Sequence, residues 1–251
     1  MKICVSGIGG HMGAEVVSLA KSGMRGASVV SGVDPNGSPF ADIPCFLSFD
    51  ELLEAAEENR PEVIVDFSHH TSTEALVSCA VSLNVPLVIA TTGQTEEEKA
   101  MIHEAAEKIP VFFASNYSVG VALLTELARQ AARVFKEADI EIVETHHNRK
   151  VDAPSGTALT LAEAMADVRE DAFITEGRSG FKKREAGEIG IQSVRRGNIV
   201  GIHEVLISTA NQTITLKHES HSRALFAEGA LAAAEFILDK PAGLYDMKSM
   251  I

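Results

Sequence analysis

The chain has 251 residues, of which 45% are hydrophobic, and its formal net charge is −13 at pH 7. This length allows one large domain or two small ones, and no apolar run is long enough to cross a membrane. An acidic surface repels phosphate backbones and disfavours nucleic acid as a partner. The three cysteines show neither paired nor metal-binding spacing, and no basic start precedes an apolar leader. We therefore expect a protein of a reducing, cytoplasmic compartment.

The first 118 residues alternate between apolar segments typical of strands and segments with helical spacing. Two S/T-x-x-E patterns, beginning at Ser48 and Thr95, have the form of capping boxes at helix starts. We expect strands at 2–7, 27–34, 62–68, 86–93 and 111–115, and helices at 12–22, 49–59, 71–83 and 95–108. Nearly continuous apolar strands separated by helices predict an α/β domain with a parallel sheet covered on both faces.

The second half has a different rhythm. We expect helices at 119–136, 157–168 and 222–239, a strand at 139–145, a polar loop at 169–188, and strands at 189–196, 199–209 and 212–220. Strands without helices between them, and an Arg-Gly-Asn turn at 196–198, predict a hairpin in a mixed or antiparallel sheet. The domains are expected to be 1–118 with 228–251, and 119–227.

A glycine-rich turn follows the first expected strand and opens the first helix. Gly7, Gly10 and Gly13 have the spacing G-x-x-G-x-x-G, and Gly9 partly restores the pattern G-x-G-x-x-G. Glycines let the backbone approach a pyrophosphate, and a helix start offers N–H donors that lack partners within the helix. This context predicts a dinucleotide site in a Rossmann-like domain, although a plain tight turn would also use glycines.

Asp34 ends the second expected strand. A carboxylate there accepts a hydrogen bond from a ribose 2′-hydroxyl and repels a 2′-phosphate. Pro35 and Asn36 follow, so no adjacent arginine can hold such a phosphate, and NADH is favoured over NADPH. The alternative is that Asp34 only forms a turn before the proline.

Three short polar side chains, Thr91, Thr92 and Asn116, follow later strands of the expected sheet. They would lie at its carboxyl edge, where open α/β sheets bind ligands. They suit a carboxamide or a ribose, and they are equally common in ordinary loops and caps.

The segment ETHHNRKVDAPSGTAL, residues 144–159, contains the side chains best suited to acid–base chemistry. His146 and His147 end a strand, and Lys150 follows in the next loop. Histidine titrates near neutral pH and is the usual proton carrier, while lysine supplies positive charge or a proton. The Pro-Ser-Gly-Thr segment at 154–157 starts a helix whose N–H groups can hold a carboxylate. The cluster predicts proton transfer to a small acidic substrate.

Other interpretations of these residues are simpler. The segment 154–157 also fits a plain helix cap, and no metal site is expected, because there is no HExxH pattern and no cysteine nearby. The remaining histidines are interpreted as structural side chains and the nearby arginines as surface charges: His203, His218 and His221, and Arg195, Arg196 and Arg223.

Six segments together resemble the dihydrodipicolinate reductase (4-hydroxy-tetrahydrodipicolinate reductase) family. They are GIGGHMG, ATTG, FASNYSVGV, ETHHNRKVDAPSGTAL, VRRGNIVGIHEV and SRALFAEGAL, and they span nearly the whole chain. The segment 144–159 is the most specific. The resemblance implies a Rossmann-like domain that binds a dinucleotide, 1–118 with 228–251, plus a smaller domain with a mixed sheet, 119–227, that binds substrate and forms the oligomer. It also implies a reductase of diaminopimelate and lysine biosynthesis that is commonly a homotetramer.

The resemblance further implies roles for individual residues. His146 would donate and accept a proton, Lys150 would donate a proton, and His147 would bind the substrate. The helix start would hold a substrate carboxylate through Ser155, Gly156 and Thr157. The dinucleotide would be held by Gly7, Ile8, Gly9, Gly10, His11, Met12, Asp34, Ala90, Thr91, Thr92, Ala114, Ser115, Asn116 and Tyr117.

Two positions depart from the usual pattern of the family. Ala90 stands where a glycine is common, and we expect cofactor binding to tolerate it. His11 stands where an arginine is common, and together with the missing arginine after Asp34 this weakens the case for NADPH. We expect hydride transfer from NADH or NADPH to 4-hydroxy-tetrahydrodipicolinate, a small dicarboxylate, with loss of water to give tetrahydrodipicolinate. The alternatives are another Rossmann oxidoreductase that acts on an acyclic amino or hydroxy acid, and an NAD(H)-sensing protein without turnover.

Overall fold

The computed structural model describes all 251 residues, and the chain divides into two compact units. Unit 1 comprises Met1–Ser118 and Ala224–Ile251, and unit 2 comprises Val119–Arg223. The sequence places the return to the first domain near residue 228. The return comes a few residues earlier, because α7 (Ala224–Ile237) is one continuous helix that lies in unit 1 from its first residue.

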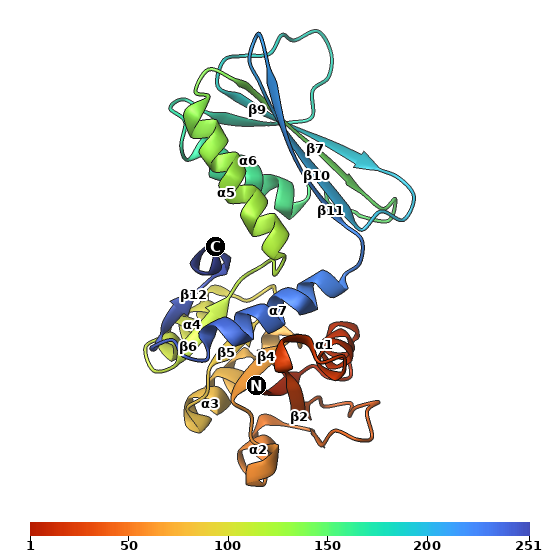
Figure 1. Ribbon diagram of the computed structural model, residues 1–251, viewed down its shortest axis with the longest axis vertical. Helices are drawn as coiled ribbons and strands as arrows, with labels where there is room; N and C mark the ends of the chain where they lie inside the picture. The colour runs from red at the N-terminus through yellow and green to blue at the C-terminus, as the bar shows by residue number, and fades with distance from the viewer. The chain divides into compact units, whose positions relative to one another are not determined.

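Unit 1 contains a sheet of seven parallel strands in the order β12-β6-β5-β4-β1-β2-β3 (Figure 1). The strands are β1 (Lys2–Ser6), β2 (Ser28–Val33), β3 (Cys45–Phe46), β4 (Val63–Asp66), β5 (Leu87–Ile89), β6 (Pro110–Phe113) and β12 (Gly243–Tyr245). The expected parallel sheet is confirmed. The sequence does not predict β3 or β12, because two or three residues are too few to show a periodic pattern.

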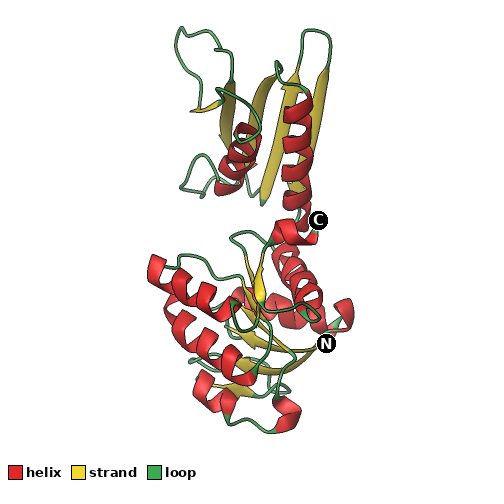
Figure 2. Cartoon of the chain, turned by 90° about the vertical axis from the view of Figure 1, so that its left-hand side faces the viewer, coloured by secondary structure: helices red, strands yellow, loops and turns green.

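Helices cover both faces of this sheet (Figure 2). α1 (His11–Lys21) packs against α7. On the other side α2 (Phe49–Leu53), α3 (Thr73–Leu83) and α4 (Glu96–Ala106) share one core with the strands. Thr95 forms the expected capping box with Glu98. α2 ends before residue 59, because Glu54, Glu57 and Glu58 place negative charge at its C-terminal end, where the helix dipole disfavours it.

The strand order of unit 1 creates a switch point between β1 and β4. From β1 the chain proceeds outward through β2 and β3, and from β4 it proceeds outward on the other side. In open α/β sheets, ligands bind beyond the carboxyl ends of the strands at such a point. The glycine turn follows β1 and residues 67–72 follow β4, so both lie where a nucleotide is expected.

Unit 2 contains a mixed five-stranded sheet in the order β11-β10-β7-β9-β8, with α5 (Val119–Val134) and α6 (Gly156–Ala166) packed on it (Figure 1). The strands are β7 (Asp139–His146), β8 (Phe173–Glu176), β9 (Glu188–Arg195), β10 (Gly201–Ser208) and β11 (Thr213–Ser220). The mixed sheet is confirmed, whereas β8 falls in a segment that the sequence predicts to be a loop. None of the helices in either unit combines the length and apolar character needed to span a bilayer.

The expected hairpin between β9 and β10 is wrong, because β7 lies between these two strands. β7 pairs parallel with β9 and antiparallel with β10. The turn at 196–198 therefore passes over the end of β7. There the N–H of Arg196 donates to the carbonyl of His146 (2.9 Å), and the N–H of His147 donates to that of Ile199 (2.8 Å).

The face of this sheet that contacts α6 changes from apolar to polar along the strands. In β7 the inward positions run Ile140, Ile142, Glu144, His146, and all four are buried. Glu144 lies opposite His203 of β10, which lies opposite His218 of β11. The polar end of this buried face positions the candidate site.

Candidate substrate and nucleotide sites

Glu144 is the centre of a buried polar cluster in unit 2. Its side chain is fully buried, and its two oxygens have different partners. Oε2 accepts from Nδ1 of His146 (2.6 Å) and from Nη1 of Arg195 (2.8 Å). Oε1 accepts from Nη2 of Arg195 (2.7 Å) and from the N–H of Ser155 (3.2 Å). One carboxylate thus joins the end of β7, the end of β9 and the start of α6.

Glu144 is ionised at neutral pH. Burial raises the pKa of its carboxyl, but hydrogen bonds from Arg195, His146 and Ser193 outweigh burial and lower the pKa from 4.5 to about 2. The paired carboxylate in turn raises the pKa of the Arg195 guanidinium. The interpretation of Arg195 as a surface charge is wrong, because its guanidinium lies inward and also donates to the carbonyl of Asp152 (2.7 Å).

His203 belongs to the same cluster and is not merely a remote structural residue. Its ring lies edge-on to that of His146, with centroids 5.2 Å apart, and its Nε2 lies 3.1 Å from the hydroxyl of Ser155. Burial, together with the charge of His146, lowers the pKa of His203 from 6.5 to about 4. A neutral imidazole therefore supports the serine that caps α6.

The start of α6 is shaped as an anion-binding end. Ser155 is the N-cap, and its hydroxyl accepts from the N–H of Ala158 (3.2 Å). Gly156 is exposed, and a side chain there would meet no neighbouring atom. No acidic residue occupies the first turn, and the carboxylate that lies at this end, that of Glu144, contacts the N–H of the N-cap Ser155 (3.2 Å).

His147 and Lys150 lie in the loop that connects β7 with α6. Nδ1 of His147 is buried and has no hydrogen-bond partner. Burial, followed by the charges of Arg149 and Arg223, lowers the pKa of His147. The ammonium of Lys150 lies 2.9 Å from the carboxylate of Asp152, whose side chain is 60% exposed. Such an exposed ion pair contributes little to stability and can be exchanged for another anion.

The glycine turn in unit 1 has the geometry that a pyrophosphate needs. Gly7 has a φ of +77°, and a Cβ on Gly13 would lie 2.1 Å from the Gly7 carbonyl oxygen, so α1 starts directly against the turn. Gly10 caps α1 without a side-chain hydrogen bond, and it is exposed together with Gly9 and His11. The first N–H groups of α1 are therefore open to an anion.

Two residues of the glycine turn, Ile8 and Met12, have side chains that are wholly or partly buried and are little available to a nucleotide. The side chain of Ile8 is fully buried and faces Gly32. Met12 is half-buried. Their expected contact with a nucleotide is thus confined mainly to the main chain.

Asp34 contacts the glycine turn and also forms a turn of its own. Its Oδ2 accepts from the N–H of Gly9 (3.0 Å), which ties it to the glycine turn. Its Oδ1 accepts from the N–H of Asn36 (2.9 Å), which is a turn-forming contact. Both oxygens keep further acceptor capacity, so the carboxylate can still receive a ribose hydroxyl.

Asp66, at the end of β4, is a buried carboxylate that the sequence analysis misses. Its Oδ1 accepts from the hydroxyls of Ser6 and Ser68, each at 2.6 Å. Burial raises its pKa, and interactions with the hydroxyls of Ser6, Ser68 and Thr91 offset the rise only in part. Asp66 thus joins the end of β1 to the end of β4. In the segment after β5, Thr91 is buried and Thr92 is exposed.

The segment after β6 has one residue whose side chain cannot face a nucleotide. The ring of Tyr117 is buried, and its hydroxyl donates to the carbonyls of Ile89 (2.8 Å) and Phe112 (3.2 Å). Only the main chain of Tyr117 is suited to the expected contact. Ser115 is exposed, and Ala90, Ala114 and Asn116 are half-buried.

The sequence contains a pattern that points to Glu144 and Arg195, two residues of the cluster that were not predicted as site residues. Inward positions of β7 alternate with outward ones, so Glu144 shares the face of Ile140 and Ile142. A carboxylate at an inward position requires a partner, and Arg195 is the cation at the corresponding end of β9. That pairing could be found only once β7 and β9 are known to be neighbours.

Comparison with known proteins assigns both units to one family. Residues 1–117 match the family described as "Dihydrodipicolinate reductase, N-terminus", and residues 120–251 match "Dihydrodipicolinate reductase, C-terminus". The chain belongs to the dihydrodipicolinate reductase family. The resemblance in the sequence motifs is thereby confirmed.

Individual members of the family align over the whole chain. The 4-hydroxy-tetrahydrodipicolinate reductases of Caldanaerobacter subterraneus subsp. tengcongensis and Clostridium novyi are 40% and 39% identical, over 100% of this chain and 98% of each relative. A dipicolinate-bound dihydrodipicolinate reductase from Paenisporosarcina sp. TG-14 has a TM-score of 0.84 and 26% identity, over 100% of this chain and 99% of that one. A probable dehydrogenase from Thermotoga maritima, at 11% identity and a TM-score of 0.64, shares the fold.

Proposed function

We propose that this chain is a 4-hydroxy-tetrahydrodipicolinate reductase. It transfers a hydride from a reduced nicotinamide dinucleotide to its cyclic dicarboxylate substrate, and water is lost to give tetrahydrodipicolinate. The observation that carries the proposal is that Glu144 holds the imidazole of His146 beside the start of α6, in a chain whose two units both match the family. The reaction belongs to diaminopimelate and lysine biosynthesis.

Unit 2 supplies the groups that a doubly negative substrate needs. The start of α6, at Ser155, Gly156 and Thr157, would hold one carboxylate. Lys150 would exchange its contact with Asp152 for the substrate. The buried Nδ1 of His147, which lacks a partner, supports a substrate contact by that ring.

His146 would manage the proton that accompanies reduction. Its Nδ1 is engaged by Glu144, so its Nε2 is the nitrogen that exchanges a proton with the substrate. Lys150 would serve as a further proton donor. Acid–base help of this kind accelerates a reaction by about 10²–10⁴-fold.

The dinucleotide would be held in unit 1 by the glycine turn and the strand ends named above. When bound, the reduced nicotinamide supplies the hydride. Asp34 favours NADH, because its carboxylate accepts a ribose hydroxyl and repels a 2′-phosphate, and no arginine follows it.

The enzyme would assemble as a homotetramer through the sheet face of unit 2 that is turned away from α5 and α6. Val194, on that face, is 38% exposed in the single chain, and Val143 and Leu206 lie on the same face. Light scattering after size exclusion should give four times the chain mass of 26.8 kDa. A monomer mass would contradict this assembly.

The assay that tests the function uses the freshly made condensation product of pyruvate and aspartate semialdehyde. Loss of reduced-nicotinamide absorbance is followed with NADH and NADPH side by side, and a panel of acyclic amino and hydroxy acids is assayed in parallel. Turnover of the cyclic substrate alone supports the proposal. Turnover of an acyclic acid favours another oxidoreductase, and NADH binding without any consumption favours a sensor.

A further inference from the structure

The contacts of Glu144 place a constraint on which nitrogen of His146 carries a proton. An ionised carboxylate has no proton to donate and can only accept hydrogen bonds. The 2.6 Å contact between Oε2 and Nδ1 of His146 therefore requires a proton on Nδ1. In the neutral imidazole, Nε2 is then left without a proton and can act as a base.

We propose that Glu144 is a positioning residue that selects this tautomer of His146 and sets the place of its imidazole relative to the start of α6. The second part follows from the other oxygen, which accepts from the N–H of Ser155. A single side chain thus holds the proton carrier and the N-cap of the anion-binding helix. The inference rests on the proposed function of the site.

Arg195 limits how a side chain at position 144 can be oriented, and it thereby limits the tautomer that His146 can adopt. It donates to both oxygens of Glu144, through Nη1 to Oε2 and through Nη2 to Oε1. Glu144→Gln keeps the shape of the side chain but has a single oxygen. That oxygen is best placed at the former Oε1, because the two donors there, Nη2 and the N–H of Ser155, cannot become acceptors, whereas Nδ1 of His146 can. The amide NH₂ then faces His146, so Nδ1 must accept, and the proton moves to Nε2.

The variant should therefore have a lower turnover because the imidazole of His146 is in the wrong tautomer, and not because nucleotide binding is impaired. A wrong histidine tautomer costs serine proteases about 10⁴-fold in turnover, and loss of general acid–base help costs about 10²–10⁴-fold. We expect kcat of Glu144→Gln to fall by about 10²-fold or more. The Kd for NADH should not change, since the glycine turn lies in unit 1.

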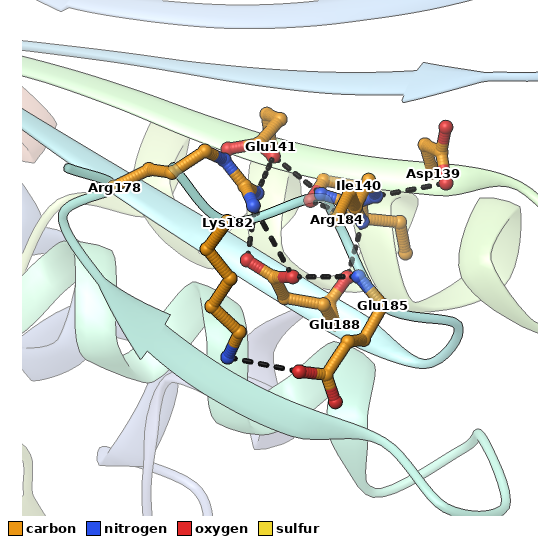
Figure 3. A network of polar contacts seen from close by, with 8 residues as sticks. All are labelled: Asp139, Ile140, Glu141, Arg178, Lys182, Arg184, Glu185 and Glu188. Carbon is orange, nitrogen blue, oxygen red and sulfur yellow. Dashed lines mark hydrogen bonds and ion pairs between the residues drawn. The ribbon is translucent and has the colours of Figure 1, made fainter. Parts of the chain in front are cut away.

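Unit 2 offers a matched control in a second buried glutamate. Glu188 of β9 is 1% exposed, and its carboxylate is clamped by Arg178, with an Nη2–Oε1 distance of 2.6 Å. Figure 3 shows this clamp within a network that includes Glu141 and Arg184, and it contains no histidine. Glu188→Gln removes the same charge from an arginine-clamped site of the same sheet.

The test is ¹⁵N NMR of histidine-labelled full-length protein at a pH where the imidazole is neutral. The His146 signals are assigned as those that disappear in His146→Gln. We expect the proton on Nδ1 in the natural chain and in Glu188→Gln, and on Nε2 in Glu144→Gln. Turnover and the Kd for NADH are measured on the same samples.

Three results would overturn the inference. The first is a proton on Nε2 in the natural chain, which needs no variant to be folded. The second is an unchanged tautomer in Glu144→Gln, and the third is an equal fall in kcat in Glu188→Gln. If no sample reduces the cyclic substrate while the tautomers behave as expected, the proposed function fails and the positioning role stands.

Discussion

Asp66 in unit 1 and Glu144 in unit 2 are buried carboxylates near the ends of central strands, and they are stabilised by different means. Asp66 of β4 is 1% exposed and receives hydrogen bonds from the hydroxyls of Ser6 and Ser68. Glu144 of β7 is fully buried and receives hydrogen bonds from the guanidinium of Arg195 and the ring of His146. The pKa of Asp66 is raised, and the pKa of Glu144 is lowered to about 2.

The difference shows how neutral and charged hydrogen-bond donors affect the pKa of a buried carboxylate. Hydroxyl groups satisfy the lone pairs of a buried carboxylate, but they bring no charge to offset its removal from water. A guanidinium satisfies the lone pairs and also supplies a positive charge. The first arrangement suits Asp66, which only ties strand ends together at the nucleotide edge. The second suits Glu144, which must stay ionised to hold the proton of His146.

The largest expected effect is on stability. Glu144→Gln leaves the half-buried guanidinium of Arg195 facing an amide NH₂ and should cost about 3 kcal/mol in the free energy of unfolding at pH 7. Asp66→Asn keeps an acceptor for the two serine hydroxyls and should cost about 1 kcal/mol or less. Urea unfolding followed by circular dichroism measures both. Equal losses would remove the distinction between the two carboxylates.

The next effect concerns two lysines that each form an ion pair with an aspartate. Lys150 pairs with Asp152 in unit 2 at 2.9 Å, and Lys21 pairs with Asp42 in unit 1 at 2.7 Å. Lys150→Met should lower kcat/KM for the dicarboxylate by about 10²-fold, because it removes both charge and a proton donor from the substrate site. Lys21→Met should leave kcat/KM unchanged. If only thermal stability changes in Lys150→Met, that lysine is structural.

A smaller effect tests the nucleotide edge of unit 1. Asp34→Asn should raise the ratio of kcat/KM for NADPH to that for NADH by about tenfold, because it removes the charge that repels a 2′-phosphate. Glu74→Gln removes an equal charge from the exposed first turn of α3 and serves as the control. The measurement is initial rates with both nucleotides. An unchanged ratio would show that Asp34 only forms the turn with Asn36.

The two carboxylates should also change stability in opposite directions with pH. Glu144 has a folded pKa of about 2 against an ordinary 4.5, so its stabilisation is present above 4.5 and is lost as pH falls towards 2. Asp66 has a raised folded pKa, so stability is lost as pH rises through it. The penalty of Glu144→Gln should therefore shrink in acid, while the relative stability of Asp66→Asn should grow as pH rises. Unfolding curves from pH 2 to 7 that show parallel trends would contradict this.

Local patterns in the sequence predicted the parallel sheet of unit 1 and most of its helices, because apolar strands alternate there with segments of helical spacing. They did not predict that β9 pairs with β7 instead of β10, since alternation shows which side chains share a face but not which strands are neighbours. Glu144 and Arg195 meet only through that pairing, and Asp66 meets Ser6 only through the pairing of β1 with β4. These partners were therefore missed, whereas His146 and the start of α6 lie in one continuous segment and were found.

The most direct measurement follows a labelled hydride through the reaction of the natural chain. The protein is incubated with NADH deuterated at the transferred position and with the freshly made cyclic substrate, and the product is analysed by mass spectrometry. The account expects one deuterium on the ring of tetrahydrodipicolinate for each NADH consumed. Consumption of NADH without deuterium in that product, or no consumption at all, would contradict it.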